Sequence, residues 1–98
     1  MSKTSSSLRS QARGRECQVR LPCCNHNPDT VVLAHVRLVG ISGLGFKSPD
    51  LFGAWACSDC HDAVDRRRHT QMDFAVVRIA HFEGMMRTQN ILLQEGKL

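Results

Sequence analysis

The chain has 98 residues, 42% of them hydrophobic, and a formal net charge of +4. This length is typical of one globular domain and excludes a second hydrophobic core. The N-terminus is polar, and no run of about 18 apolar residues occurs, so we expect neither a signal peptide nor a membrane span. These features predict a cytoplasmic protein, in which cysteines bind metals more often than they form disulfides.

Residues 1–14 are rich in serine and arginine and lack a hydrophobic repeat, which predicts a flexible basic arm. Residues 1–20 hold five basic side chains against one acidic, and this imbalance accounts for the positive charge of the chain. Such an arm can neutralise nucleic-acid phosphates, and it is equally typical of a solvated tail. We therefore assign residues 15–98 to a single folded domain.

The first part of this domain is expected to change from turns to a strand. Residues 15–30 are dense in Cys, Asn and Pro, which predicts a turn-rich knuckle. Residues 31–39 are a β-branched run that predicts a strand. Because side chains alternate along a strand, His35 and Arg37 are expected to point away from its more apolar face, formed by Val32, Ala34, Val36 and Leu38.

The remaining elements are a second strand and two helices. Residues 40–49 contain three glycines and a proline and are expected to form a loop, followed by an extended piece at 52–56. One helix should begin near Ser58, capped by Ser58 or Asp59. A second should span 73–93, with an apolar stripe that can pack on its own domain or on a second copy: Ala75, Ile79, Phe82, Met86 and Leu93.

The five cysteines are the strongest chemical signal. Cys57 and Cys60 form a C-x-x-C, and Cys17 and Cys24 precede them by more than thirty residues. Two such pairs predict a tetrahedral zinc site, which in a small domain can supply ~10 kcal/mol or more of folding free energy. A thioredoxin-like redox motif would need a βαβ context that we do not find, and unliganded core cysteines are the other alternative. Cys23 competes with Cys24 for the role of ligand.

His61 and Asp65 suggest a second site next to the C-x-x-C. On a helix that begins near Ser58 they lie at i and i+4 on one face, where they can offer a nitrogen and an oxygen to a divalent cation such as Mg²⁺. A hydrogen-bonded surface pair is the simpler interpretation. The three arginines that follow can bind phosphate oxygens or remain solvated: Arg66, Arg67 and Arg68.

His35 could face this pair from the strand. A neutral imidazole next to a metal-bound phosphate can take a proton from water, as phosphodiester hydrolysis requires. A single strand histidine is also common as a structural residue.

This order of motifs resembles the HNH, or ββα-metal, nuclease superfamily. Its zinc-containing members have a cysteine pair before a strand histidine and end with C-x-x-C-H at the start of a helix. AHVRL is similar to the first segment and CSDCH to the last. The closer resemblance is to the YbcO-type nuclease family of small phage and prophage proteins. It runs from RGRECQVRLP through NPDTVVLAHVRLVGISGLG and KSPDLFGAWACSDCHDAVDRRRH to EGMMRTQ, roughly residues 13–90.

The resemblance implies a small α+β fold, namely a zinc-stapled HNH-like core with a C-terminal helix. It implies a metal-dependent DNA endonuclease that acts in the cytoplasm of a bacterial host. His35 would be the general base and His61 the histidine that binds metal or phosphate. Structural zinc would be held by Cys17, Cys24, Cys57 and Cys60. Cys24 fits better than Cys23 because the family pattern sets one cysteine before an asparagine. We assign nucleic-acid contacts to Arg37, Arg66 and Arg67.

Two positions depart from the superfamily pattern. Ala34 occupies the place before the base, where many members carry a metal ligand. The superfamily pattern has an asparagine a few residues before the final C-x-x-C, but this stretch of the chain has none, and Asp50 is the nearest polar substitute. A non-catalytic zinc-stapled nucleic-acid-binding adaptor in phage recombination or replication is therefore the competing interpretation, and a protein-interaction module is a third. A homodimer is compatible with all three.

Overall fold

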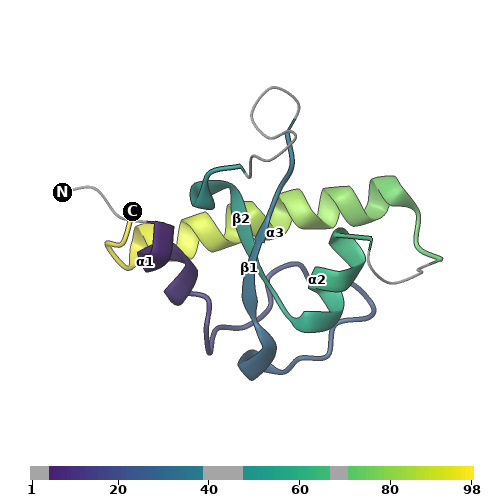
Figure 1. Cartoon of the computed structure of the whole chain (residues 1–98), viewed down its shortest axis with the longest axis horizontal. Helices are drawn as coiled ribbons and strands as arrows, with labels where there is room; N and C mark the ends of the chain where they lie inside the picture. The colour runs from purple at the N-terminus through teal and green to yellow at the C-terminus, as the bar shows by residue number, and fades with distance from the viewer. Residues whose placement is uncertain (1–4, 39–47, 67–70) are drawn as a thin grey trace.

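The computed structural model describes residues 5–38, 48–66 and 71–98. The elements in chain order are α1 (Ser5–Ser10), β1 (Val32–His35), β2 (Gly53–Ala56), α2 (Ser58–Val64) and α3 (Phe74–Gln94) (Figure 1). Two 3-10 turns lie at Pro28–Thr30 and Asp50–Phe52. This is the small α+β fold with a C-terminal helix that the sequence predicts. Within the described ranges, no helix is both long and apolar enough to cross a membrane.

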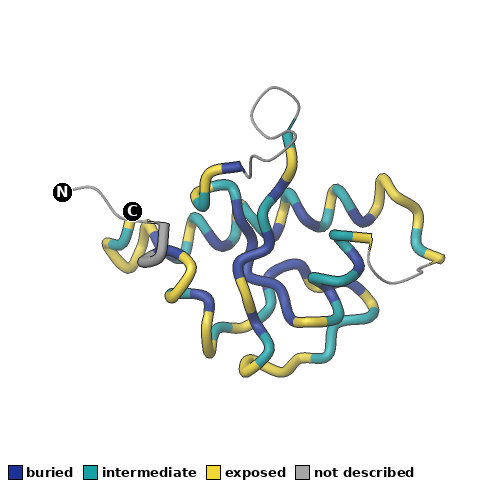
Figure 2. The backbone as a smooth tube through the Cα atoms, viewed as in Figure 1, coloured by how far each residue is buried: buried dark blue, intermediate teal, exposed yellow. Residues whose placement is uncertain are grey.

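The two strands form an antiparallel pair at the centre of the molecule. The register runs from Val32 opposite Ala56 to His35 opposite Gly53. All four residues of β2 are buried, and α3 runs across the hairpin and packs chiefly on this strand (Figures 1 and 2). Small side chains at Ala34 and Ala54, both 0% exposed, allow neighbouring elements to approach closely.

The buried side of α3 is selected by hydrogen bonding and close packing. Thr88 Oγ1 accepts a hydrogen bond of 3.0 Å from the backbone N–H of Trp55, which satisfies a buried donor on β2. Gly84 lets the N-terminal segment pass, because a Cβ there would lie 3.0–3.1 Å from the backbone of Gln18 and Val19. The buried residues of α3 are Val77, His81, Gly84, Thr88 and Leu92.

The apolar stripe of this helix therefore does not belong to the domain core. Ile79 is 58% exposed, Met86 56% and Leu93 63%. Ala75 is exposed and Phe82 is half-buried. The sequence allows the stripe to pack on its own domain or on a second copy, and these exposures show that most of the stripe does not pack on its own domain.

The N-terminal region differs from the flexible arm expected from its composition. Residues 5–10 form α1, and the side chains of Leu8 and Ala12 are 9% and 1% exposed. Arg9 Nε donates to Asp50 Oδ2 over 3.2 Å, which ties this region to the turn before β2. Two isolated apolar residues among serines and arginines are too weak a pattern to predict this helix from sequence.

Arg15 connects the N-terminal segment to the end of α3. Its two terminal nitrogens donate to the carboxylate of Glu95 over 2.5 and 2.6 Å. The guanidinium also lies 4.6 Å from the centroid of the Trp55 ring. The hydrogen bond from Arg15 lowers the pKa of Glu95 from its ordinary 4.5 to about 2.

The ion pair between Arg15 and Glu95 predicts a pH-dependent stability difference between the wild type and Glu95→Gln. Since the pKa of Glu95 is depressed in the folded state, its stabilising effect is complete above about pH 5 and is lost as the pH falls from about 4.5 toward 2. In urea unfolding, the wild type should be more stable at neutral pH, by a small margin because the pair is solvent-accessible. Glu16→Gln, at another exposed position, is the control. A difference that stays constant or grows on acidification would contradict this prediction.

Candidate metal centre and active site

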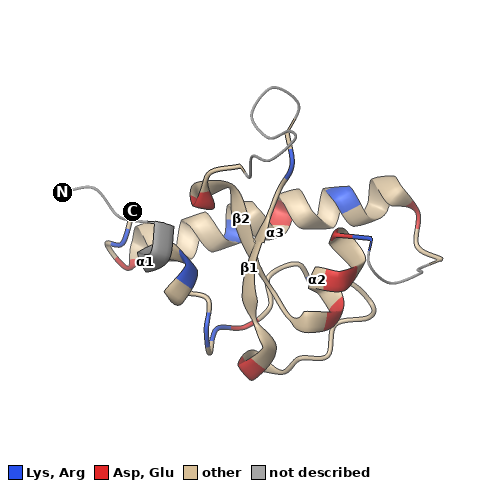
Figure 3. Ribbon diagram, viewed as in Figure 1, with Lys and Arg blue, Asp and Glu red and all other residues tan. Residues whose placement is uncertain are grey.

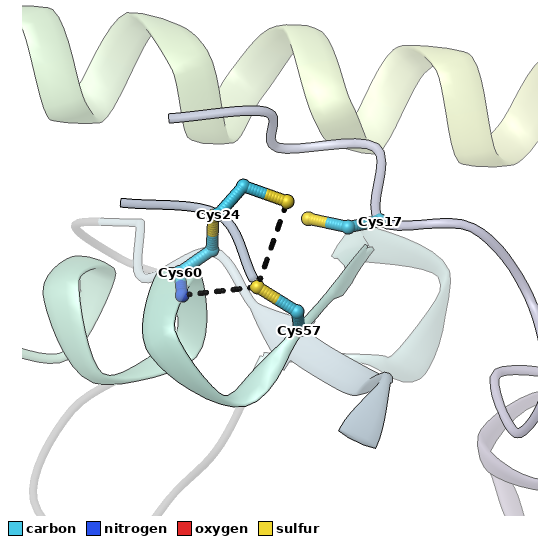
Figure 4. Close-up of side chains that lie close together, drawn as sticks. All are labelled: Cys17, Cys24, Cys57 and Cys60. Carbon is cyan, nitrogen blue, oxygen red and sulfur yellow. Dashed lines mark hydrogen bonds between the residues drawn. The ribbon is translucent and has the colours of Figure 1, made fainter. Parts of the chain in front are cut away.

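Four cysteine side chains meet between the N-terminal knuckle and the start of α2 (Figure 4). Their sulfur atoms all lie within 4.8 Å of one another, and those of Cys24 and Cys57 are 3.7 Å apart. A tetrahedral Zn²⁺ with Zn–S bonds of about 2.3 Å separates its sulfurs by about 3.8 Å. The cluster, which consists of Cys17, Cys24, Cys57 and Cys60, can therefore hold a metal ion such as zinc.

Backbone hydrogen bonds hold Cys57 in place within the cluster. Cys57 is the N-cap of α2, where sequence reasoning favoured Ser58 or Asp59. Its Sγ accepts hydrogen bonds of 3.4 Å from the backbone N–H groups of Cys60 and Asn25. These bonds orient the sulfur toward the cluster and join the two chain segments.

Asn25 is a structural residue of the centre that the sequence analysis did not single out. Its side-chain amide donates to Ser58 Oγ over 2.9 Å and to Asp59 Oδ2 over 3.0 Å. Its Oδ1 accepts a hydrogen bond of 2.9 Å from the backbone N–H of Asn27. The knuckle is thus fastened to the first turn of α2. The family pattern, which sets a cysteine before an asparagine, is the sequence feature that could have indicated the role of Asn25.

Cys23 lies beside the cluster but outside it. Its Sγ is 3.8 Å from the backbone oxygen of Asp59. The structure thus brings Cys24 together with the other three thiols and leaves Cys23 as a neighbour.

The thiols perturb one another strongly. The hydrogen bond with Cys60 lowers the pKa of Cys17 to about 4 and raises the pKa of Cys60 itself. Burial raises the pKa of Cys24 to about 11. Four thiolates at this spacing repel one another, and a divalent cation compensates that repulsion. The donor set is therefore suited to a soft or borderline cation.

His35 lies at the end of β1 and is held by a carboxylate. Its Nε2 is 2.5 Å from Asp50 Oδ1, and the two side chains are 18% and 8% exposed. The second oxygen of Asp50 accepts the hydrogen bond from Arg9. Burial raises the pKa of Asp50, but the hydrogen bonds from His35 and Arg9 outweigh it and lower the pKa below its usual value. Asp50 is therefore an ionised partner that fixes the His35 ring.

His61 and Asp65 form a second pair at the end of α2. His61 Nε2 lies 3.1 Å from Asp65 Oδ2, in the i, i+4 relation expected on one helix face. This distance fits a hydrogen bond. It also fits an octahedral Mg²⁺, whose bonds of about 2.1 Å place adjacent ligand atoms about 3 Å apart. The pair can thus offer two neighbouring ligands to a hard cation.

His81 is a further histidine of this region, and sequence reasoning did not select it. It is 5% exposed, and its Nε2 donates over 2.8 Å to the backbone oxygen of Ala34, the residue before His35. Burial lowers the pKa of His81, while the nearby carboxylate of Asp65 acts in the opposite direction. His81 is therefore a neutral link between α3 and β1, near the pair on α2.

The structure describes two of the three arginines that the sequence analysis assigns to nucleic-acid contacts, Arg37 and Arg66. Arg37 is exposed two residues after His35, and its backbone oxygen accepts from Arg78. Arg66 follows α2 with its guanidinium 5.2 Å from the centroid of the Phe74 ring. Arg67 and Arg68 lie outside the described residues.

The predicted site residues thus form one cluster and two pairs. Among the residues that the structure describes, the four thiols are the one group of three or more ligating side chains with all ligand atoms within 4.8 Å. His35 pairs with Asp50, and His61 pairs with Asp65. The structure does not combine the two pairs into a single ligand set.

A family model, two relatives and a solved structure all match this chain over more than 90% of its length. The model of the family described as "Putative nuclease YbcO" matches residues 6–97. Proteins of that name from Escherichia coli strain K12 and from Enterobacteria phage 82 are each 57% identical over 90 residues, which cover 91% of this chain and 93% of the relative. A solved structure of a "putative bacteriophage protein" from Escherichia coli K-12 substrain MG1655 is 49% identical. It superposes with a TM-score of 0.77 over 92% of this chain and all of the other.

Proposed function

Because this chain belongs to the "Putative nuclease YbcO" family, we propose that it is a metal-dependent endonuclease of the HNH type that hydrolyses phosphodiester bonds in DNA. The observation that supports this most is the position of the two histidine–carboxylate pairs. One ends the first strand of the hairpin, and the other projects from the helix that starts at the thiol cluster. An enzyme of this kind would act in the cytoplasm of a bacterial host.

His35 is the proposed general base. With Nε2–H directed at Asp50, the lone pair of Nδ1 is available to take a proton from water. The Asp50 carboxylate holds the ring in this tautomer and stabilises the imidazolium that forms. Asp50 thereby serves as the positioning partner of the base, as the nearest polar substitute for the asparagine of the superfamily pattern.

His61 and Asp65 would hold a divalent cation. When bound, such a cation neutralises charge on the scissile phosphate and on the leaving oxygen. Acidic residues gather on α2 (Figure 3), where Asp59, Asp62 and Asp65 lie close in sequence. A phosphate would be repelled from this helix without a cation, and this supports metal dependence. Arg37, Arg66 and Arg67 are proposed to contact flanking phosphates.

Zinc is the proposed occupant of the thiol cluster, with a structural role. It would keep the knuckle on the N-terminus of α2 and so fix the helix that carries His61 relative to the hairpin that carries His35.

Plasmid nicking tests the proposed activity. We expect the zinc-loaded protein, stripped of weakly bound ions, to convert supercoiled DNA to nicked or linear forms only when Mg²⁺, Mn²⁺ or Ni²⁺ is added. Absence of cleavage with every metal, Zn²⁺ included, would contradict the endonuclease proposal. If salt-sensitive DNA binding remained in that case, it would favour the adaptor, which the missing ligand at Ala34 supports.

A further inference from the structure

We propose that α3 pairs in parallel with α3 of a second copy of this chain through its exposed apolar stripe. We define the stripe as Ala75, Ile79, Phe82, Met86 and Leu93. This inference is independent of the nuclease proposal, because none of these residues takes part in the proposed chemistry.

The spacing of the stripe is that of a helix–helix seam. Positions 75, 79, 82, 86, 89 and 93 alternate between steps of four and three, which is the repeat of coiled-coil core positions. Five of the six are apolar, and Gln89 is the exception. The side-chain amide of Gln89 turns toward its own domain, where it donates a hydrogen bond of 2.7 Å to the backbone oxygen of Leu51. The repeat is complementary to a second copy of itself, as a two-fold symmetric interface requires.

The exposed apolar area is a large part of what such an interface needs. Ile79, Met86 and Leu93 each expose more than half of their surface, and Val76, on the flank of the stripe, is 55% exposed. Each of these four side chains offers on the order of 100 Å², or about 400 Å² together. This is about half of the roughly 800 Å² per partner that specific interfaces bury, and the polar flanks of the helix would add to it. The helix of 21 residues is also long enough, at about 30 Å, to support this contact.

Charge on the flanks of the stripe favours the parallel arrangement. Arg78 and Glu83 lie on opposite sides of the seam and five positions apart. In a parallel pair these are the positions that meet across the interface, so Arg78 of each copy faces Glu83 of the other. An antiparallel pair centred on the same stripe would instead bring the two Glu83 side chains together. The guanidinium of Arg78 already packs 4.8 Å from the centroid of the Phe82 ring, which holds it at the edge of the stripe.

The chemistry of the stripe argues against nucleic acid as its partner. None of its five side chains carries a charge or a hydrogen-bond donor, so the surface has nothing to offer to phosphates.

Sedimentation velocity over a concentration series tests the proposal on the full zinc-loaded chain. We expect a reversible dimer in the wild type. Ile79→Glu/Met86→Glu should weaken it by roughly 100-fold or more, because the dimer would bury unpaired carboxylates. Circular dichroism and zinc content should stay unchanged, since both positions are exposed in the monomer. Gln94→Glu, at an exposed position outside the stripe, is the matched control and should leave the dimer intact.

A charge exchange tests the alignment. Arg78→Glu and Glu83→Arg should each weaken the dimer by roughly threefold to tenfold, and the double exchange should restore it. A wild type that remains monomeric at every concentration would overturn the proposal, as would a dimer that tolerates Ile79→Glu/Met86→Glu. A dimer that depends on the stripe but is not restored by the double exchange would overturn the parallel alignment.

Discussion

Cys57→Ser is expected to abolish zinc binding and to unfold the knuckle together with the start of α2. Cys57 is fully buried, caps α2 and accepts backbone hydrogen bonds from both segments of the centre. Serine supplies a shorter and harder ligand atom that suits zinc poorly. Because metal binding can contribute ~10 kcal/mol or more to the folding of a small zinc domain, loss of one ligand should leave little cooperative unfolding. Zinc content by mass spectrometry and thermal melts by circular dichroism measure both effects.

Cys23→Ser is the matched control for this experiment. Its sulfur lies outside the thiol cluster, so this variant should retain one zinc ion per chain and a melting temperature close to that of the wild type. Cys24→Ser should behave like Cys57→Ser. A Cys57→Ser protein that keeps zinc and its fold would contradict the metal centre. Loss of zinc in Cys23→Ser but not in Cys24→Ser would contradict the assignment of the ligands.

His35→Ala is expected to lower the rate of DNA cleavage by about 10²- to 10⁴-fold, the usual contribution of a general base. Asp50→Asn should cause a smaller loss, because the amide can still contact the ring but no longer stabilises an imidazolium. His61→Ala should raise the metal concentration needed for activity, since it removes one of two proposed ligands. Initial rates of plasmid nicking across a metal titration separate these effects.

Folded controls make the loss of activity interpretable. His35 is half-buried, is not part of the thiol cluster and pairs with Gly53, four residues before Cys57, so His35→Ala should keep its zinc and its DNA affinity. Gln94→Ala, at an exposed position at the end of α3, should cleave at the wild-type rate. Full activity in His35→Ala would rule out this residue as the base.

The parts of the fold that follow from local pattern could be predicted from the sequence. The β-branched run before His35, the short extended piece before Cys57 and the long helix after Asp73 all correspond to elements of the structure. The spacing of the cysteines was sufficient to predict a metal-binding cluster, because four thiols in a small chain have few other uses.

Features that depend on contacts between distant segments were not predictable. The buried side of α3 is set by Thr88, which accepts a hydrogen bond from the backbone N–H of Trp55 on β2, and by Gly84, which lies against the backbone of Gln18. The contact between His35 and Asp50 joins side chains 15 positions apart in the sequence, and no local pattern specifies it. The helix at residues 5–10 is stabilised by tertiary contacts of Leu8 and Arg9 and not by its own sequence.

Paramagnetic broadening of the histidine ring signals by Mn²⁺ tests most directly whether the two histidine–carboxylate pairs serve one reaction centre. In a titration of the zinc-loaded protein followed by NMR, the His61 signals should broaden first and those of His35 soon after. His26, which lies beside the thiol cluster with its Nδ1 3.8 Å from Cys24 Sγ, should be affected last. If His61 broadens while His35 stays sharp, or if neither responds before His26, the two pairs do not share a cation-dependent site and the hydrolytic account is wrong.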